Sequence, residues 1–204
     1  MEYETAKVAV NPVILSIIGD NLVVLLNPRE KAPYKGRYEL PGGLLLRGED
    51  PEVALKRKLQ ALIGGTDVYF VQFKTFADPR RDPRWRTVSI GYVALVQQDM
   101  INDRKGWFGM SELPATAFDH SQIIGDARTF LKRNISEVIA KQFLPKLFPI
   151  NSLQRVYETI EEKKYDNRNF RKKMVYDGIV EETEKLLENC SYRPPRLYRF
   201  VKRR

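Results

Sequence analysis

The sequence predicts an α/β protein in which a mixed β-sheet lies between helices, followed by a small domain of two helices and a two-stranded ribbon. Three observations support this. β-rich runs and helical segments alternate over the first 147 residues, the stretch Leu147–Ile150 interrupts that pattern, and positive charge is concentrated after it. We therefore expect two domains, residues 1–147 and residues 148–204.

The first domain is expected to begin with a hairpin, because β-rich runs over Val8–Ile18 and Asn21–Leu26 flank Gly19-Asp20-Asn21. Further strands are predicted at Val68–Phe76, Thr87–Gln97 and Trp107-Phe108, and Tyr38–Leu46 is expected to form a strand and a glycine turn. Helices are predicted at Pro51–Leu62, Met110–Pro114 and His120–Phe143, the last because its apolar residues recur at helical spacing. On the first of these helices, Val53, Leu55, Leu59 and Leu62 are expected to face inward. The result is an α/β/α sandwich.

The second domain is expected to hold two helices and a ribbon. Ser152 is a candidate cap for a helix that runs to about Lys163, and Asp166 for a second helix over residues 167–177. Gly178 is a plausible stop for the second helix. Strands are predicted at Ile179–Thr183 and Arg196–Val201, on either side of a polar turn at Glu184–Ser191. Two helices followed by such a ribbon form a winged helix-turn-helix.

Composition excludes several classes of protein. The chain is 43% hydrophobic, and no run of about 18 apolar residues is present, so no transmembrane helix or membrane partner is expected. The N-terminus, Met1–Glu4, is acidic and lacks the pattern of a signal peptide. With one cysteine, Cys190, and one histidine, His120, an intramolecular disulfide and a His/Cys zinc cluster are both excluded. We expect a cytoplasmic protein.

The net charge of +9 is unevenly distributed. Residues 146–204 carry 15 Lys and Arg against 9 Asp and Glu, a net +6, which is two thirds of the excess. Positive charge concentrated in a small domain favours a polyanionic partner. The alternative is a solvated basic tail, which charge by itself does not exclude.

Residues 43–65 carry a spaced motif. Gly43 is followed after five residues by Glu49 and after seven more by Arg57, and Leu59 and Gly64 continue the pattern. Leu40-Pro41-Gly42-Gly43 leads into it. This spacing and lead-in resemble the box of the Nudix hydrolases, in which the glutamate and arginine tie the loop to a helix. The resemblance implies the Nudix fold.

The metal-binding part of that box is absent. Nudix hydrolases use glutamates on the helix to hold Mg²⁺ or Mn²⁺, and here those positions are Lys58, Ala61 and Leu62. We therefore expect no catalytic residue, no metal ligand and no cofactor. An altered metal site remains an open alternative, and its candidate carboxylates are Glu39, Asp50, Glu52, Asp78, Asp82 and Glu112.

A ligand with a diphosphate suits the residues around this motif. Arginines bind phosphates through charge-assisted hydrogen bonds, and glycines let backbone amides approach them. Tyr38 or Trp85 is available to stack on a base or ribose. The predicted ligand-binding residues are Arg37, Tyr38, Gly42, Gly43, Arg81, Asp82, Arg84 and Arg86. A local Arg81–Asp82 pair is the alternative for that loop, and His120 is placed either at a domain junction or beside a helix cap from Asp119 or Ser121.

The second helix of the small domain has the composition of a DNA-reading helix. Phe170, Met174 and Val175 are expected to face the core, which turns the basic residues outward. Arginine matches guanine and asparagine matches adenine in the major groove. The predicted DNA-binding residues are Asn167, Arg168, Asn169, Arg171, Lys172, Lys173, Arg193 and Arg196. An ordinary amphipathic helix with a solvated basic face is the alternative.

Taken together, the chain resembles the NrtR family of transcriptional regulators over nearly its whole length. The most specific segments are Asp78–Arg84, Val88–Val96, Ala117–His120, Val156–Glu158, Arg168–Lys173 and Arg193–Phe200. The resemblance implies a homodimeric repressor of NAD metabolism genes that binds an operator in double-stranded DNA and senses ADP-ribose or a related metabolite. Three alternatives remain: a pentose-responsive regulator of similar architecture, a metal-dependent ADP-ribose pyrophosphatase, and a pseudoenzyme that binds RNA or protein through its basic tail.

Overall fold

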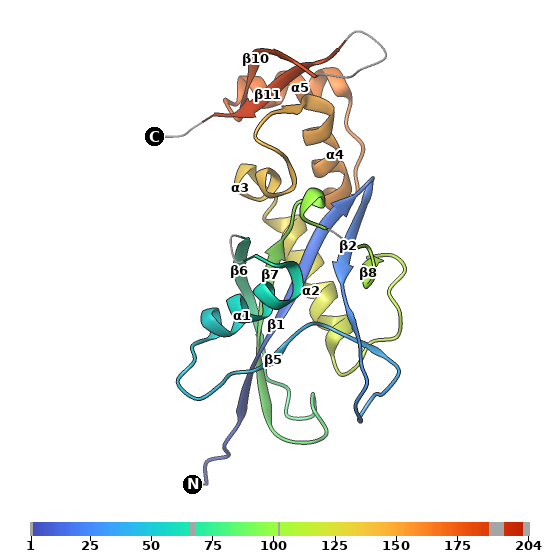
Figure 1. Cartoon of the computed structure of the whole chain (residues 1–204). Coiled ribbons are helices and arrows are strands. Elements are labelled where there is room, and N and C mark those ends of the chain that lie inside the picture. The colour runs from blue at the N-terminus through green and yellow to red at the C-terminus, as the bar shows by residue number, and fades with distance from the viewer. Residues whose placement is uncertain (1, 66–67, 102, 188–193, 202–204) are drawn as a thin grey trace. The chain divides into compact units, whose positions relative to one another are not determined.

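The computed structural model describes residues 2–65, 68–101, 103–187 and 194–201 (Figure 1). The chain divides into two compact units, Met1–Phe130 and Leu131–Arg204. The predicted domain boundary after residue 147 stays a prediction. Cys190 and Arg193 lie outside the described residues.

A mixed sheet forms the centre of the first unit. Its strands are ordered β6 (Tyr69–Phe76), β7 (Thr87–Leu95), β1 (Lys7–Ile18), β2 (Asn21–Leu25) and β8 (Trp107–Gly109), and β5 (Gly43–Leu44) also pairs with β1. β1 and β7 run parallel, whereas the other pairs are antiparallel. A separate two-stranded ribbon joins β3 (Asn27–Pro28) to β4 (Tyr38–Glu39). The predicted α/β class with a mixed sheet is confirmed.

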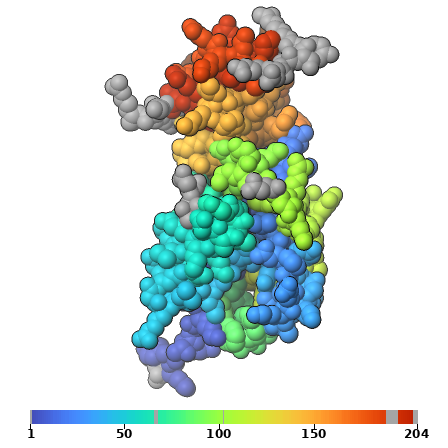
Figure 2. Space-filling model, in the orientation of Figure 1, coloured from blue at the N-terminus to red at the C-terminus, as the bar shows by residue number. Residues whose placement is uncertain are grey.

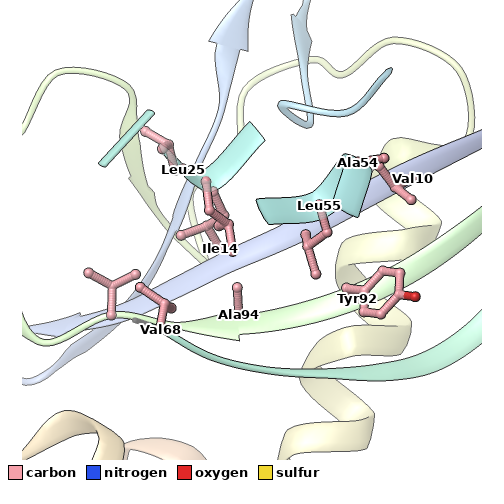
Figure 3. Packing of buried hydrophobic residues seen from close by; sticks show 10 residues of the cluster. Val10, Ile14, Leu25, Ala54, Leu55, Val68, Tyr92 and Ala94 are labelled. Atoms are coloured by element: carbon pink, nitrogen blue, oxygen red, sulfur yellow. The ribbon is translucent and has the colours of Figure 1, made fainter. Parts of the chain in front are cut away.

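Helices cover both faces of this sheet. α1 (Pro51–Ile63) lies in front of it in Figure 1, and α2 (His120–Arg133) lies behind. In the core between α1 and the sheet, Val10 and Ile14 of β1 face Ala54 and Leu55 of α1 (Figure 3). The prediction that Val53 faces inward is wrong: this side chain is 51% exposed, because the helical turn brings Ala54 inward instead.

Local sequence fixes both ends of α1. The Asp50 carboxylate accepts a hydrogen bond from the amide of Val53 (2.9 Å), and Pro51 fits the first turn, where no amide hydrogen is needed. Gly64 ends the helix with φ of +69°. The outer side of α1 forms part of the molecular surface (cyan in Figure 2). Within the described residues, none of the helices has both the length and the apolar character of a membrane span.

The second unit is a winged helix-turn-helix, as predicted. Its helices are α3 (Glu137–Ala140), α4 (Ile150–Glu161) and α5 (Asn167–Tyr176). A sheet with the order β10 (Val180–Leu186), β11 (Arg196–Phe200) and β9 (Phe148–Pro149) forms the wing. Phe148 is completely buried, and its ring lies 4.9 Å from that of Phe200. The strand β9 was missed because two residues give no periodic signal.

Several predicted element bounds are wrong. The single helix over His120–Phe143 is interrupted after Arg133, because Ser136 adopts an extended backbone (φ −152°) before α3 and a 3₁₀ turn at Lys141–Phe143. α4 begins at Ile150 directly after Pro149, so Ser152 does not cap it. Met110–Pro114 forms a turn and no helix. β10 continues to Leu186, where a polar turn was expected, because its register with β11 extends that far.

Candidate functional site

A cavity of about 240 Å³ opens in the first unit beside the Gly42-Gly43 turn. The predicted ligand residues Gly42, Gly43, Arg81, Asp82 and Arg84 line it. The other lining residues are Ala9, Asn11, Arg29, Glu39, Leu40, Leu44, Trp85, Thr87, Phe118 and His120. Loops far apart in the sequence therefore meet around one space that presents both guanidinium groups and aromatic rings.

Three predicted ligand residues lie outside this lining. Arg37 donates a hydrogen bond to the carbonyl of Thr116 (3.3 Å), and the ring of Tyr38 lies against that of Phe108 at 4.8 Å. Arg86 donates a hydrogen bond to the carbonyl of Ala77 (2.8 Å). Of the two candidate stacking residues, only Trp85 lines the cavity, and it is 41% exposed there. Contact of Arg37, Tyr38 or Arg86 with a ligand stays a prediction.

Gly42 is required where the chain passes β1. A Cβ atom at this position would lie 2.1 Å from Oδ1 of Asn11 and 2.6 Å from the carbonyl oxygen of Val10. Such a short distance to backbone cannot be relieved by rotating a side chain. The glycine therefore permits close packing of the turn on β1, and through it positions the adjacent Gly43.

Each arginine that lines the cavity has its own carboxylate. Arg29 pairs with Glu39 (2.5 Å), Arg81 with Asp119 (2.8 Å) and Arg84 with Asp82 (2.8 Å). The alternative of a local Arg81–Asp82 pair is therefore wrong. Burial acts to raise the pKa of Asp82, but the hydrogen bonds from Arg84 outweigh it and leave that pKa below its usual value.

His120 lies in the cavity wall within the first unit, and its place at a domain junction stays a prediction. Its Nδ1 accepts a hydrogen bond from the amide of Leu40 (2.9 Å), and its Nε2 lies 3.5 Å from the side-chain amide of Asn11. Burial, and then the charges of Arg81 and Arg29, lower the pKa of His120 to about 3. The neutral ring therefore links the Leu40–Gly43 turn to the start of α2.

Acid is expected to weaken the fold through His120. Below about pH 6.5 the unfolded chain binds a proton that the folded chain excludes until about pH 3. The free energy of unfolding should therefore fall by up to about 1.4 kcal/mol per pH unit between these values from this group. Chemical unfolding across that range should show a shallower slope for His120→Gln. Because His120 is the only histidine in the chain, an imidazole NMR signal that titrates near pH 6.5 in the folded protein would contradict this.

The structural half of the Nudix box is assembled as predicted. Glu49 accepts hydrogen bonds from Nε and Nη2 of Arg57 (2.7 and 2.8 Å) and from the amide of Leu46 (2.8 Å). These bonds, led by those from Arg57, lower the pKa of Glu49 to about 2. The pair therefore fixes the loop before α1 to the helix.

The metal ion that Nudix hydrolases use does not fit the residues present. A Cβ built on Gly43 would lie 2.6 Å from Cε and 2.8 Å from Nζ of Lys58, so an ammonium group occupies the space over the turn. Across the described segments, no three His, Cys, Asp or Glu side chains cluster as a metal site. Of the carboxylates in the altered site, Glu39 and Asp82 are paired with arginines and Asp50 caps α1.

The second unit presents the predicted basic helix. The Asp166 carboxylate accepts a hydrogen bond from the amide of Asn169 (2.9 Å), which confirms the predicted cap of α5. Phe170 and Met174 are buried, but Val175 is 45% exposed, so its predicted place in the core is wrong. The predicted DNA-binding residues of this helix are all exposed: Asn167, Arg168, Asn169, Arg171, Lys172 and Lys173.

The cations of α5 and of the wing differ in how they are neutralised. Within the part of the chain that the structure describes, Arg168, Arg171, Lys172 and Lys173 make no ion pair, so their charge faces solvent. On the wing, by contrast, Arg196 is exposed but pairs with Glu182 at 3.0 Å. Arg193, also predicted to bind DNA, falls outside the described residues. Among the described residues, these four unpaired cations therefore share one helix, α5.

Glu158 fixes the turn between α4 and α5, a role that the sequence did not reveal. Its Oε1 accepts hydrogen bonds from the side-chain amide of Gln154 and the backbone amide of Tyr165, and its Oε2 accepts one from Lys164, each at 2.9 Å. Gln154 also donates to the carbonyl of Tyr165 (2.9 Å). These bonds, led by that from Gln154, lower the pKa of Glu158 to about 2.

Replacement of Glu158 by glutamine should lower the melting temperature at neutral pH, because the ionised carboxylate is the better acceptor for three donors. The folded pKa lies below the ordinary 4.5, so the stabilisation is complete above pH 4.5 and is lost as the pH falls toward 2. The difference from wild type should shrink over that interval. Glu184→Gln, on an exposed residue of β10, is the control. A difference independent of pH would argue against an ionised Glu158.

A Nudix-type α/β unit with a cavity, joined to a winged helix with an exposed basic helix, defines a class of ligand-binding domains coupled to DNA-binding domains. Family models agree: a NUDIX domain matches residues 8–126, and the NrtR DNA-binding winged helix domain matches residues 140–200. The chain belongs to the Nudix family and, within it, to the NrtR regulators.

Individual relatives match both units. The ADPR responsive transcriptional repressor NtrR of Acinetobacter baylyi is 29% identical over 98% of this chain and 84% of its own. The structure of Shewanella oneidensis NrtR complexed with a 27mer DNA is 27% identical, with a TM-score of 0.82, over 95% of this chain and 93% of that one. The NUDIX domain of the same protein complexed with ADP ribose is 27% identical, with a TM-score of 0.54, over 63% and 90%.

Proposed function

We propose that this chain is a transcriptional repressor that binds double-stranded DNA through α5 and releases it when ADP-ribose occupies the cavity of the Nudix unit. The observation that carries the proposal is the exposed, unpaired basic face of α5 in the same chain as a Nudix cavity whose helix lacks metal-binding carboxylates. The repressor and the ADP-ribose complex among the relatives support both halves.

The cavity suits the chemistry of ADP-ribose. A diphosphate needs hydrogen-bond donors, and the guanidinium groups of the cavity wall offer them although each arginine is paired with a carboxylate. Trp85 lines the same space and contributes an aromatic ring to it, with Nζ of Lys7 3.2 Å from the ring centroid. Ligand binding can end DNA binding only if the DNA-bound conformation has the lower affinity for ADP-ribose.

We further propose that the protein acts as a homodimer on genes of NAD metabolism and that it is cytoplasmic. Two winged helices bind half-sites about one helical turn apart, so a small rotation of one against the other lowers affinity for the operator. The same proposal holds that the chain does not hydrolyse ADP-ribose, because Lys58, Ala61 and Leu62 replace the carboxylates that a divalent cation requires.

The test is fluorescence anisotropy with duplex DNA from upstream of the protein's own operon, with and without ADP-ribose. We expect sequence-specific binding at moderate salt, reversed by ADP-ribose, and no release of AMP from ADP-ribose in MgCl₂. Preference for RNA over duplex DNA would contradict the proposal. Brisk magnesium-dependent cleavage together with indifference to operator DNA would instead identify a pyrophosphatase. Reversal by a pentose rather than ADP-ribose would place the chain in the pentose-responsive branch.

A further inference from the structure

We infer that Lys58 takes the place of the divalent cation and neutralises the diphosphate of the ligand, so that binding is independent of metal. This inference rests on the proposed binding of ADP-ribose. It concerns a residue of the degenerate box that does not itself line the cavity. Lys58 acts through its contact with Gly43, which belongs to the turn that lines the cavity.

The position of the ammonium group is set by the backbone. The space that a side chain of residue 43 would fill is occupied by Cε and Nζ of Lys58, at 2.6 and 2.8 Å from the ideal Cβ position. Gly43 therefore gives room to the lysine as well as access to its own backbone. A phosphate that approaches Gly43 from the cavity meets a positive charge on the helix side of the turn.

The charge balance of the cavity gives Lys58 its role. Arg29, Arg81 and Arg84 are each held by a carboxylate, so the three pairs contribute almost no net charge. Among the described residues, Lys58 forms no ion pair. Glu49, whose pKa the charge of Lys58 also helps to lower, forms its ion pair with Arg57 at 2.7 Å. Lys58 is therefore the cation beside the turn whose charge is available to a ligand.

The ammonium group of Lys58 can replace one of the two functions of a divalent cation. A divalent cation in a Nudix hydrolase neutralises the diphosphate and also activates water. An ammonium group can do only the first, because it donates hydrogen bonds but has no open coordination position for water. Replacing glutamate by lysine at this position therefore exchanges a metal ligand for a fixed counter-charge. Affinity for a diphosphate is retained, while activation of water by metal is lost.

Calorimetric titration of the full chain with ADP-ribose and, separately, with inorganic pyrophosphate tests this inference. Each titration is run in EDTA and in excess MgCl₂. For the wild type we expect the same affinity for ADP-ribose in both. Lys58→Gln should weaken binding of either probe roughly 10- to 100-fold, the range for a lost hydrogen bond to a charged group. Lys58→Arg should remain within about threefold of wild type, because it keeps the charge.

Lys56→Gln is the matched control, since Lys56 is exposed on the same helix and its loss changes the net charge equally. It should leave both affinities unchanged. A wild type that requires Mg²⁺, or Lys58→Gln binding as well as wild type, overturns the inference while leaving the effector in place. If ADP-ribose does not bind but pyrophosphate binds in a manner that depends on Lys58, the proposed effector fails and the inference holds. If neither probe binds, both fail.

Discussion

A chain with both Arg168 and Arg171 replaced by alanine is expected to bind operator DNA roughly 30-fold to 10⁴-fold less tightly than wild type. Both side chains are exposed on α5 and make no ion pair within the described residues. Binding of a duplex to these side chains would therefore break no ion pair among the described residues. Each contact of an arginine to a base or phosphate contributes about 1–3 kcal/mol, so the pair contributes about 2–6 kcal/mol. Anisotropy titration at fixed salt measures the change.

A control variant separates the contribution of α5 to DNA binding from the effect of net charge. Lys141 and Lys146 are exposed in the same unit but outside α5, and replacing both by alanine removes the same two charges. This control should bind nearly as wild type does. Repeating the titration at several salt concentrations adds a second measure. Loss of one phosphate contact should reduce the slope of log affinity against log salt concentration by about one. Equal losses in the two double variants would show that α5 is not the reading helix.

Phe148→Ala is expected to lower the free energy of unfolding of the winged-helix unit by about 3–5 kcal/mol, the usual cost of removing a buried phenylalanine ring. Phe148 is fully buried on β9, which pairs with β11, and its ring packs against Phe200 at 4.9 Å. The cavity left behind would loosen the edge of the wing. Denaturant unfolding followed by circular dichroism provides the measurement.

The matched control is Tyr176→Ala, which removes an aromatic ring of similar size that is 91% exposed. Its effect on unfolding should be within about 0.5 kcal/mol, as for other surface changes. DNA binding by Phe148→Ala should fall with the loss of the folded unit, while binding of ADP-ribose to the Nudix unit is retained. A Phe148→Ala protein as stable as the control would show that β9 is not part of the core.

The predictions that succeeded depend on short separations in the sequence. The pair of Glu49 and Arg57 spans eight residues, and the Asp166 cap of α5 spans three. Contacts over such short separations can be predicted, because a helix places residues three and four apart on the same side. The winged helix was predicted for the same reason, because the apolar residues of α4 and the buried Phe170 and Met174 of α5 recur at helical spacing.

The contacts that were missed join distant segments. Arg81 reaches Asp119 across 38 residues, and the amide of Leu40 reaches His120 across 80. No pattern in a single sequence specifies which arginine takes which carboxylate, so the local pair of Arg81 with Asp82 was a reasonable alternative. The break after α2 was also missed, since apolar spacing continued through it.

By itself, the sequence determined the two fold classes, the loss of the metal-binding carboxylates and the basic helix. Each of these depends only on composition or on the spacing of residues that are close in the sequence. Only the tertiary structure decided which charges are available. It paired the three arginines of the cavity and placed the ammonium of Lys58 over Gly43. The physical reason is that electrostatic partners are chosen by distance in space, which the path of β1, the loops and α2 sets and the order of residues does not.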